Sequence, residues 1–482
     1  MNRLNRNTFT VLLVGLLVLT GLQGIVGAES LFYDPDVWWH LRIGEWIVEQ
    51  RAVPQTDPFS SYGADRLWVS YSWLSDLLMY WSYAAFGLAG VVMFVTAVWL
   101  LIVVALCGLL LRVRPAPLVI LTLVLVGHLA ISRLGGPRPW LLSILFFIVQ
   151  LDILLTAGRR RALYLLCLLP PLYVVWTACH IQFVNGLVVL GLALVESAAA
   201  RFPRLPSFLE VDEAIPFTPL CATAVLCFAA TFFSPYHYHT YEAVWDLVHQ
   251  VRFWDMLFEL RAMGFRTLPD WLVLGLTLAA AAALGWKRRV RCFLLLLWLA
   301  GLYFSFRSSR DVWFVTVASL VVLADAVPDE LTIRLSLGWP RWLGVATAAC
   351  GLLAAASRAT LSNARLEESV ARNFPDRALA FIDQQEYPGP AAHSVTWGGY
   401  WMWRNRRLPV ALDWRTTVHG QDRILRHMGN WSGQPGWEND PELRDARLVL
   451  VERATPLHEL LRRSGKFEQV YEDELAAVLI RK

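Results

Sequence analysis

The residues best suited to chemistry are two aspartates separated by one proline, Asp34 and Asp36, in the stretch "FYDPDVWWH". Two neighbouring carboxylates can share a divalent cation, or one can take up a proton while the other stays charged. They follow the first apolar run of the chain, where charge close to hydrocarbon is costly. We therefore predict a catalytic or cation-binding role; the alternative is an Asx-type turn.

Two pairs of arginines are the second group of candidates. Arg307 and Arg310 lie in "YFSFRSSRDVWF", and Arg133 and Arg138 lie in "ISRLGGPRPW". Each pair follows or precedes an apolar run. Guanidinium groups bind phosphate bidentately, so we predict that these arginines bind the phosphate of a lipid substrate. The alternative is that they extend towards the phosphates of ordinary membrane lipids.

Single residues at similar positions complete the set of candidates. His40 could face a phosphate, or it could be a solvated position on a surface helix, "VWWHLRIGEWIVEQ". His180, in "WTACHIQF", is a candidate substrate contact, and Glu259, in "WDMLFELR", is a further acid or an interfacial helix charge. Three other histidines lack a strong zinc-binding spacing: His237, His239 and His249.

The composition places these residues in a membrane protein. Of 482 residues, 56% are hydrophobic and only 17% are charged, and the mean hydropathy is +0.45. In soluble domains, about a quarter of the residues are charged. The net charge of +4 gives no indication of nucleic-acid binding. The sequence contains no phosphate-binding glycine loop, nucleophile elbow or CxxC motif, which disfavours an ATPase or a serine hydrolase.

Apolar runs of suitable length predict about eleven membrane-spanning helices. We interpret the first run as a retained span; a cleaved signal peptide is the alternative. Residues 71–87 are short and carry Asp76, which favours an interfacial helix. The predicted spans are 8–28, 88–111, 116–133, 140–157, 162–179, 183–200, 215–233, 270–286, 291–306, 312–327 and 341–357.

The arginines and lysines between these spans predict the topology. With a cytoplasmic N-terminus, nearly every basic cluster beside a span falls inside, as the positive-inside rule requires. The loop 29–87, the loop 234–269 and the segment after 358 then lie outside. We therefore predict a transmembrane domain over 1–357 that contains both loops, followed by an external domain over 358–482.

The predicted external domain reads as a small α/β domain. Helices are expected at "FPDRALAFIDQQ", "GQDRILRHMGNW" and "TPLHELLRRSG", the last beginning at a capping Thr455 and ending at Gly465. Strands are expected at "PVALD" and "ARLVLVE", and "FEQVYED" with "AAVLIRK" should form a closing hairpin.

This arrangement resembles the GT-C superfamily of membrane glycosyltransferases, which includes protein mannosyltransferases and the catalytic subunit of oligosaccharyltransferase. "DPDVWWHLRIGEWIVE" is similar to the family opening "DPxFNYRxxxYxV", which places the catalytic, metal-binding aspartate at Asp34. "GGYWMWRNRRLPVALDWRT" (398–416) is similar to "DYGYWIxxxxNRxxxxDxxT", with the distance from Gly399 to Asp413 preserved. The chain also resembles bacterial multispanning proteins that carry "DPDxWWHL" and "WGGY" motifs.

The resemblance implies a GT-C-like helical membrane fold, a polyprenyl-linked sugar donor and further site residues at Trp397, Tyr400 and Asp413. Two departures from the family pattern matter. The second acidic motif is replaced by a Gly-Gly segment followed by Arg138, and Trp397 stands where the family has an acid. With fewer metal ligands, a polyprenyl-monophosphate donor and metal-independent catalysis are favoured; a Mg²⁺ or Mn²⁺ ion held by Asp34 is the alternative.

We therefore expect an inverting glycosyltransferase in the bacterial inner membrane, with its site and C-terminal domain on the periplasmic or extracellular side. Nucleotide sugars do not reach that side, so a lipid must carry the activated sugar to an unidentified glycan, lipid or protein acceptor. The alternative is a catalytically inactive GT-C-like scaffold or subunit of an envelope assembly. A transporter is disfavoured because few ionisable residues fall within the spans: His128, Asp152 and Glu196.

Overall fold

The computed structural model describes residues 3–202, 205–250, 252, 257, 259–332 and 339–482. The chain divides into two compact units, and each is described by itself. The first contains Met1–Val26, Met93–His237 and Phe253–Thr360; the second contains Gly27–Val92, Tyr238–Arg252 and Leu361–Lys482. The second unit therefore joins the C-terminal segment to the first predicted external loop and to part of the second loop.

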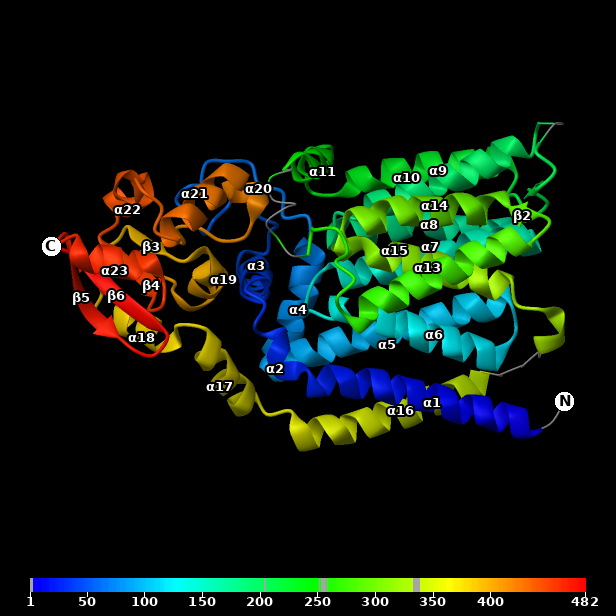
Figure 1. Cartoon of the computed structure of the whole chain (residues 1–482), viewed down its shortest axis with the longest axis horizontal. Helices are drawn as coiled ribbons and strands as arrows, with labels where there is room; N and C mark the ends of the chain where they lie inside the picture. Colours follow the sequence, from blue (N-terminus) through cyan, green and yellow to red (C-terminus); the bar gives the residue numbers. More distant parts are fainter. Residues whose placement is uncertain (1–2, 203–204, 251, 253–256, 258, 333–338) are drawn as a thin grey trace. The chain divides into compact units, whose positions relative to one another are not determined.

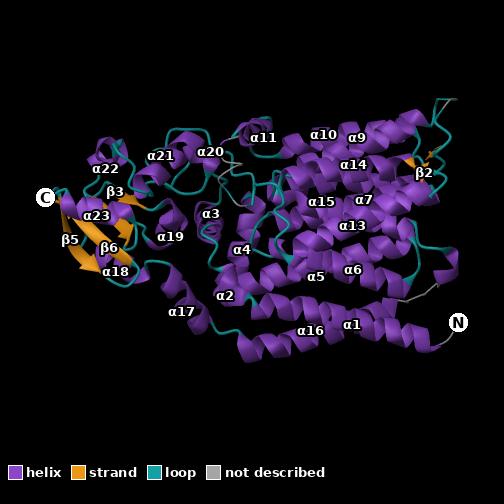
Figure 2. Ribbon diagram, in the orientation of Figure 1, coloured by secondary structure: helices purple, strands orange, loops and turns teal. Residues whose placement is uncertain are grey.

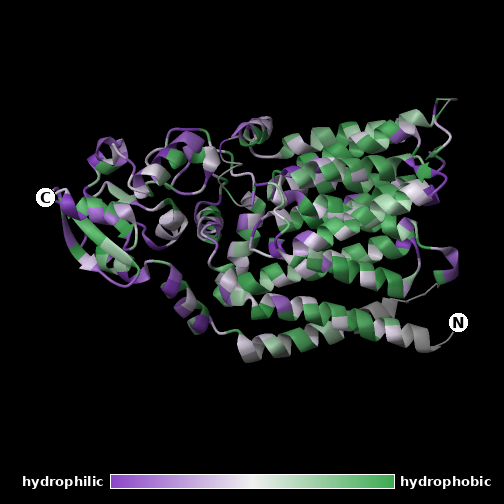
Figure 3. Ribbon diagram, viewed as in Figure 1, coloured by the Kyte–Doolittle hydropathy of each residue, from purple (hydrophilic) through white to green (hydrophobic). Residues whose placement is uncertain are grey.

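The first unit is a bundle of long helices (Figure 1). Apolar side chains dominate their sequences, and Figure 3 shows hydrophobic colouring along most of their length. The helices are α1 (Arg3–Val26), α5 (Leu88–Val113, whose first turn belongs to the second unit), α6 (Pro117–Ile131), α7 (Trp140–Arg160), α8 (Leu169–Cys179), α9 (Phe183–Ala199), α10 (Phe217–Ala230), α13 (Leu268–Trp286), α14 (Cys292–Arg307), α15 (Val312–Asp325) and α16 (Trp339–Thr360).

Short elements connect these helices. A two-stranded parallel sheet pairs β1 (Leu209–Glu210) with β2 (Val290–Arg291). Helix α13 begins at a reciprocal capping box between Thr267 and Asp270, with a proline in its first turn. The 3₁₀ turns are η1 (Ser132–Leu134), η2 (Leu163–Leu168), η3 (Thr231–Phe233), η4 (Ser309–Asp311) and η5 (Asp329–Leu331).

Each predicted span overlaps a helix or a helix joined to a 3₁₀ turn. Within the described residues, five helical segments are long and apolar enough to cross a membrane, so the chain is a membrane protein by length and composition; the number of about eleven spans stays a prediction. The five segments are Thr8–Val26, Leu88–Val113, Pro117–Leu134, Trp140–Arg160 and Leu268–Trp286.

The second unit combines helices with a four-stranded sheet (Figure 2). The strand order is β3 (Ala391–His393), β4 (Leu448–Glu452), β6 (Ala476–Arg481) and β5 (Phe467–Glu472); β3 runs parallel to β4, and the other pairs are antiparallel. The helices are α2 (Ala28–Leu31), α3 (Asp36–Gln50), α4 (Trp73–Phe86), α11 (His239–His249), α17 (Asn363–Asn373), α18 (Asp376–Gln384), α19 (Val395–Arg404), α20 (Thr416–His419), α21 (Gln421–Trp431), α22 (Pro441–Asp445) and α23 (Pro456–Arg463), with the 3₁₀ turn η6 (Trp437–Asn439).

The strand predictions are partly confirmed. "ARLVLVE" contains β4, and the closing hairpin is β5–β6, whose register includes the pair of Phe467 with Arg481. The strand predicted at "PVALD" is wrong: Val410 makes only an isolated bridge to Ser60. The parallel edge of the sheet is instead β3, a short run that lacks a strong strand pattern. This strand has only three residues between Pro390 and a helix, which is too short for an alternating hydrophobic pattern to be recognised.

The predicted helices of this segment are confirmed as α18, α21 and α23. The Thr455 side chain does not cap the helix that follows it; its hydroxyl donates to the Glu452 carbonyl at 2.8 Å. Gly465 does follow the helix with a positive φ of 68°, a conformation that glycine adopts without steric cost.

Candidate functional site

The Asp34–Asp36 segment is a tight turn that begins helix α3. The Asp36 backbone N–H donates to Asp34 Oδ1 at 3.0 Å, and Pro35 precedes the helix with φ of −64°. This is the Asx-type turn considered as the alternative. Asp36 is buried and Asp34 is half-buried. The geometry fixes the orientation of the Asp34 carboxylate, and its catalytic role stays a prediction.

Helix α3 is buried or half-buried from Asp36 to Ile47 and exposed from Val48 to Gln50, so the interpretation of His40 as a solvated position is wrong. His40 is 2% exposed and its Nδ1 lies 2.6 Å from Asp76 Oδ1 on α4. Burial raises the pKa of Asp76 well above its usual range, against a lowering contribution from the Ser72 hydroxyl. His40 therefore ties α3 to α4 and lies away from solvent.

The second recognised motif packs directly on the first. In α19 the Tyr400 ring meets Trp38 of α3 edge-on, with ring centroids 4.9 Å apart. A Cβ added at Gly399 would lie 2.5 Å from the Pro35 carbonyl oxygen, so only glycine permits this close approach. Trp397 is 3% exposed, and the Tyr400 hydroxyl donates to Asp376 at 2.8 Å. The structure thus brings together the two motifs that the resemblance singled out.

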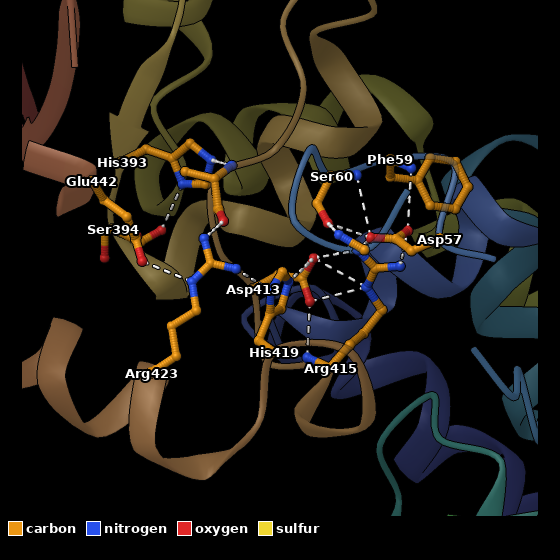
Figure 4. A network of polar contacts seen from close by, with 12 residues as sticks. Asp57, Phe59, Ser60, His393, Ser394, Asp413, Arg415, His419, Arg423 and Glu442 are labelled. Atoms are coloured by element: carbon orange, nitrogen blue, oxygen red, sulfur yellow. Dashed lines mark hydrogen bonds and ion pairs between the residues drawn. The ribbon is translucent and has the colours of Figure 1, made fainter. Parts of the chain in front are cut away.

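Asp413 belongs to a buried ionic network (Figure 4). Arg415 pairs with Asp413 at 2.7 Å and with Asp57 at 2.7 Å, and all three side chains are at most 2% exposed. Burial alone would raise the pKa of Asp413, but Arg415 and His419 outweigh it, and this pKa lies well below its usual range. Breaking such a pair leaves an uncompensated buried charge, which costs about 3–5 kcal/mol.

The network shows what the sequence interpretation missed. The position of Asp57 in "TDPFS" predicts a turn residue, and its carboxylate accepts hydrogen bonds from the Phe59 and Ser60 backbone N–H groups. Its ion pair with Arg415 joins segments 358 positions apart. The signal in the sequence is the "DWR" near the end of the second motif, which places Arg415 two residues after Asp413.

In the first unit, a cluster forms around the Trp140 ring. The guanidinium carbons of Arg310 and Arg138 lie 4.8 Å and 5.3 Å from its ring centroid. Arg310 NH1 lies 4.0 Å from Glu259 Oε1, and Arg310 NH2 lies 3.5 Å from His180 Nε2. Four predicted residues therefore gather here, although they come from four separate loops of the chain.

The donors of Arg310 are incompletely used. Its contacts to Glu259 and His180 are long for hydrogen bonds. Its Nε is buried and has no hydrogen-bond partner within the described part of the chain. Burial, together with the charge of Arg310, lowers the pKa of His180 well below its usual range, so this ring is neutral. The cluster consequently keeps a cation with unused donors at its centre.

His180 is fixed by neighbours that sequence reasoning did not identify. Its Nδ1 lies 2.9 Å from the Ser143 hydroxyl, which also accepts a hydrogen bond from Trp176 at 2.9 Å. Next to Arg310, Asp311 accepts a hydrogen bond from Gln182 at 2.6 Å. Burial raises the pKa of Asp311 to about 6, although Arg310 and Gln182 oppose this shift.

The remaining predicted arginines have different surroundings. Arg133 is paired with Asp270 and donates to the Ser309 carbonyl, so it holds η4 against α13. This structural contact is distinct from both alternatives considered for it. Arg307 is the last residue of α14. The predicted acids Asp34 and Asp36 belong to the second unit and the arginines to the first, so a common pocket for them stays a prediction.

A metal site would need several oxygen or nitrogen ligands. Among the described residues, no group of three or more His, Cys, Asp or Glu side chains gathers in a suitable arrangement. One oxygen of the Asp34 carboxylate, Oδ1, accepts the Asp36 N–H group. A Mg²⁺ or Mn²⁺ ion held by Asp34 therefore stays a prediction.

Comparisons with known proteins give one decisive result. No protein-family model matches the chain, and no curated protein matches its sequence. The apo crystal structure of the Archaeoglobus fulgidus oligosaccharyltransferase is similar, with a TM-score of 0.52 and 14% identity over 91% of this chain and 69% of that one. The fold is GT-C-like.

At this identity the likeness concerns the fold. A second structure, the Archaeoglobus fulgidus enzyme in complex with an inhibitory peptide and a dolichol-phosphate, has a TM-score of 0.49 and 13% identity over 90% of this chain and 69% of that one. The predicted GT-C-like fold is confirmed by the first of these structures. The Asp34 turn is the candidate catalytic group of the second unit, and the Trp140 cluster is the candidate binding group of the first unit.

Proposed function

We propose that this protein is a membrane glycosyltransferase that transfers a sugar from a polyprenyl-phosphate donor to an acceptor hydroxyl at the external membrane face. The GT-C-like fold supports the enzyme class. The single observation that carries the donor assignment is the Arg310 cation, whose buried Nε has no hydrogen-bond partner within the described residues. A phosphate oxygen is the ligand that such a guanidinium binds best.

The proposed reaction gives one role to the Asp34 turn and another to the Arg310 cluster. Asp34 removes the proton of the acceptor hydroxyl while the acceptor oxygen attacks the anomeric carbon of the donor sugar. The bond between that carbon and the phosphate oxygen breaks, its electron pair stays on the phosphate, and the configuration inverts. Arg310, with Arg138 beside it, stabilises the charge that develops on the departing lipid phosphate. Asp36, which begins α3, holds the Asp34 carboxylate in place through its N–H group.

Donor binding can be tested without knowing the acceptor. We would titrate the purified full-length chain in detergent with undecaprenyl phosphate and follow tryptophan fluorescence, since Trp140 lies under Arg310. Arg310→Ala should weaken binding about tenfold or more, because a charge-assisted hydrogen bond contributes 1.5–3 kcal/mol. The matched control is Arg252→Ala, which changes a guanidinium that is 73% exposed. Equal affinity of wild type and Arg310→Ala would remove this arginine from the donor site.

Catalysis is tested separately with membranes that contain polyprenyl-phosphate sugars. Asp34→Asn should abolish sugar transfer while leaving undecaprenyl phosphate binding unchanged, because the amide cannot take up the proton. Asp65→Asn, an exposed aspartate in the same loop, is the control. Donor binding without transfer by the wild-type chain, together with a stoichiometric protein partner in a detergent pull-down, would instead support an inactive subunit of an envelope assembly.

A further inference from the structure

The second unit contains a large open cavity that the proposed reaction does not use. Its volume is about 790 Å³, within the range of ligand-binding pockets. Helix α11, the loop after Asp57 and the α20–α21 segment form its walls. The residues that matter most here are Tyr62, Arg66, Trp245, His249, Arg423 and Glu442.

One side of this cavity is rigidly built. Arg423 donates to Glu442 at 2.7 Å and to the Ala411 carbonyl at 3.0 Å, and it lies 3.2 Å from His419. Figure 4 shows how these contacts continue into the Asp413 network beneath. The guanidinium carbons of Arg423 and Arg66 each lie 4.0 Å from the Tyr62 ring centroid. These side chains are ordered before any ligand arrives, which lowers the entropic cost of binding.

The opposite wall presents an aromatic surface. Trp245 on α11 is 65% exposed, and His249, one turn later, lies beside it with ring centroids 4.0 Å apart and the rings tilted by 32°. The helix is connected to the rigid wall because Gln250 donates to the Thr416 carbonyl at 3.5 Å and Arg252 pairs with Asp422 at 3.1 Å. A large exposed indole at the wall of a cavity is a ready stacking platform.

The charges of the cavity identify the class of ligand. Its lining contains three arginines and three carboxylates, so the formal charges cancel: Arg66, Arg423 and Arg426 against Asp246, Asp422 and Glu442. Neither an anion nor a cation gains a net Coulombic advantage in such a site. A neutral ligand that carries both donors and acceptors fits it better, because guanidinium groups donate and carboxylates accept.

We propose that this cavity binds a neutral saccharide. The apolar C–H face of a pyranose ring would stack on Trp245, and its hydroxyl groups would bond to the carboxylates and arginines around it. Such a site would hold the acceptor of a glycosyltransferase, and it would equally serve a glycan-binding protein without catalysis. The affinity of this cavity for saccharides can therefore be measured independently of sugar transfer.

The test is an array of neutral and anionic oligosaccharides probed with the full-length chain in detergent. Neutral gluco-, manno-, galacto- and chito-oligosaccharides should be retained in preference to uronic-acid and sulfated ones. Trp245→Ala should weaken the retained interaction about tenfold, the upper range for aromatic stacking. Trp81→Ala, which removes an indole that is 53% exposed on α4 outside the cavity, should leave the affinity unchanged.

A second variant distinguishes a loss of binding from a loss of folding. Asp246→Asn changes an exposed acceptor in the lining without altering its size, and it should weaken neutral-saccharide binding several-fold while the unfolding temperature stays constant. Three results would each overturn the proposal: no neutral saccharide bound, a preference for anionic glycans, or the same affinity in wild type, Trp245→Ala and Asp246→Asn.

Discussion

Two buried histidines of the second unit are fixed in their neutral form by the backbone. His393 Nε2 accepts the Ala411 N–H at 3.0 Å, while its Nδ1 lies 3.1 Å from the Ser394 carbonyl. His427 Nε2 accepts the Val395 N–H at 3.1 Å. A proton on either Nε2 would place two N–H groups against each other. Burial lowers the pKa of His393 to about 4, and the pKa of His427 lies well below its usual range.

This geometry predicts loss of stability in mild acid. The unfolded chain binds a proton at His393 below its ordinary pKa of about 6.5, whereas the folded chain does so only near pH 4. Stability is therefore complete above pH 6.5 and falls as the pH drops towards 4. We expect a loss of about 2 kcal/mol between pH 7 and pH 5, measured by thermal unfolding of the full chain in detergent.

The comparison that isolates His393 uses two variants. His393→Gln keeps an acceptor for the Ala411 N–H but cannot be protonated, so its unfolding temperature should fall less steeply with pH. His239→Gln changes a histidine that is paired with Glu242 at the surface and should keep the wild-type slope. Identical slopes in wild type and His393→Gln would contradict the assignment.

At the scale of elements, helix α19 is the connection between the two recognised motifs. Gly399 allows the Pro35 carbonyl of the Asp34 turn to approach the helix, and Gly398 allows the Leu412 carbonyl, just before Asp413, to approach its other side. Added Cβ atoms would lie 2.5 Å and 2.1 Å from these oxygens, and a backbone atom cannot move aside as a flexible side chain can. The two glycines of the "WGGY" motif are therefore explained by the close packing of α19 against the Asp34 turn and against the segment before Asp413.

Gly399→Ala should displace the Asp34 turn from α19. Overpacking of this kind costs about 1–3 kcal/mol, and sugar transfer should fall together with the unfolding temperature. Gly275→Ala is the control, because its added Cβ meets no atom within 4 Å and alanine favours a helix. An unfolding temperature of Gly399→Ala equal to that of wild type would show that the approach of α3 to α19 does not depend on this glycine.

At the scale of the whole molecule, the distribution of basic residues predicts which segments face outside. Trp286, at the end of α13, is 92% exposed and precedes the basic run from Lys287 to Arg291. Arg463, at the end of α23, has a side chain that is 80% exposed. The positive-inside rule places the first position in the cytoplasm and the second outside.

Cysteine labelling tests this topology. In a Cys167→Ala background, which removes an exposed native thiol, we would introduce Trp286→Cys and Arg463→Cys separately. A membrane-impermeant maleimide applied to intact cells should label Arg463→Cys and should reach Trp286→Cys only after the membrane is opened. Labelling of both positions from the same side would contradict the predicted topology and the external location of the site.

The sequence by itself determined the helices and the membrane environment, because hydrophobic periodicity and run length are local properties that burial imposes on each element. It also indicated the GT-C-like fold, through short motifs whose glycines and aspartates have local turn and packing roles. The hairpin β5–β6 was equally readable, since both strands and their turn are adjacent in the chain.

Only the tertiary structure decided which of these residues meet. The pairing of Asp57 with Arg415, the burial of His40 against Asp76 and the gathering of Arg310 around Trp140 all join segments that are distant in sequence. The sequence does not distinguish a charged residue that forms an ion pair from one that faces solvent or one that binds a ligand. Its role is set by long-range packing, which fixes the distance to its partners and the water excluded around it.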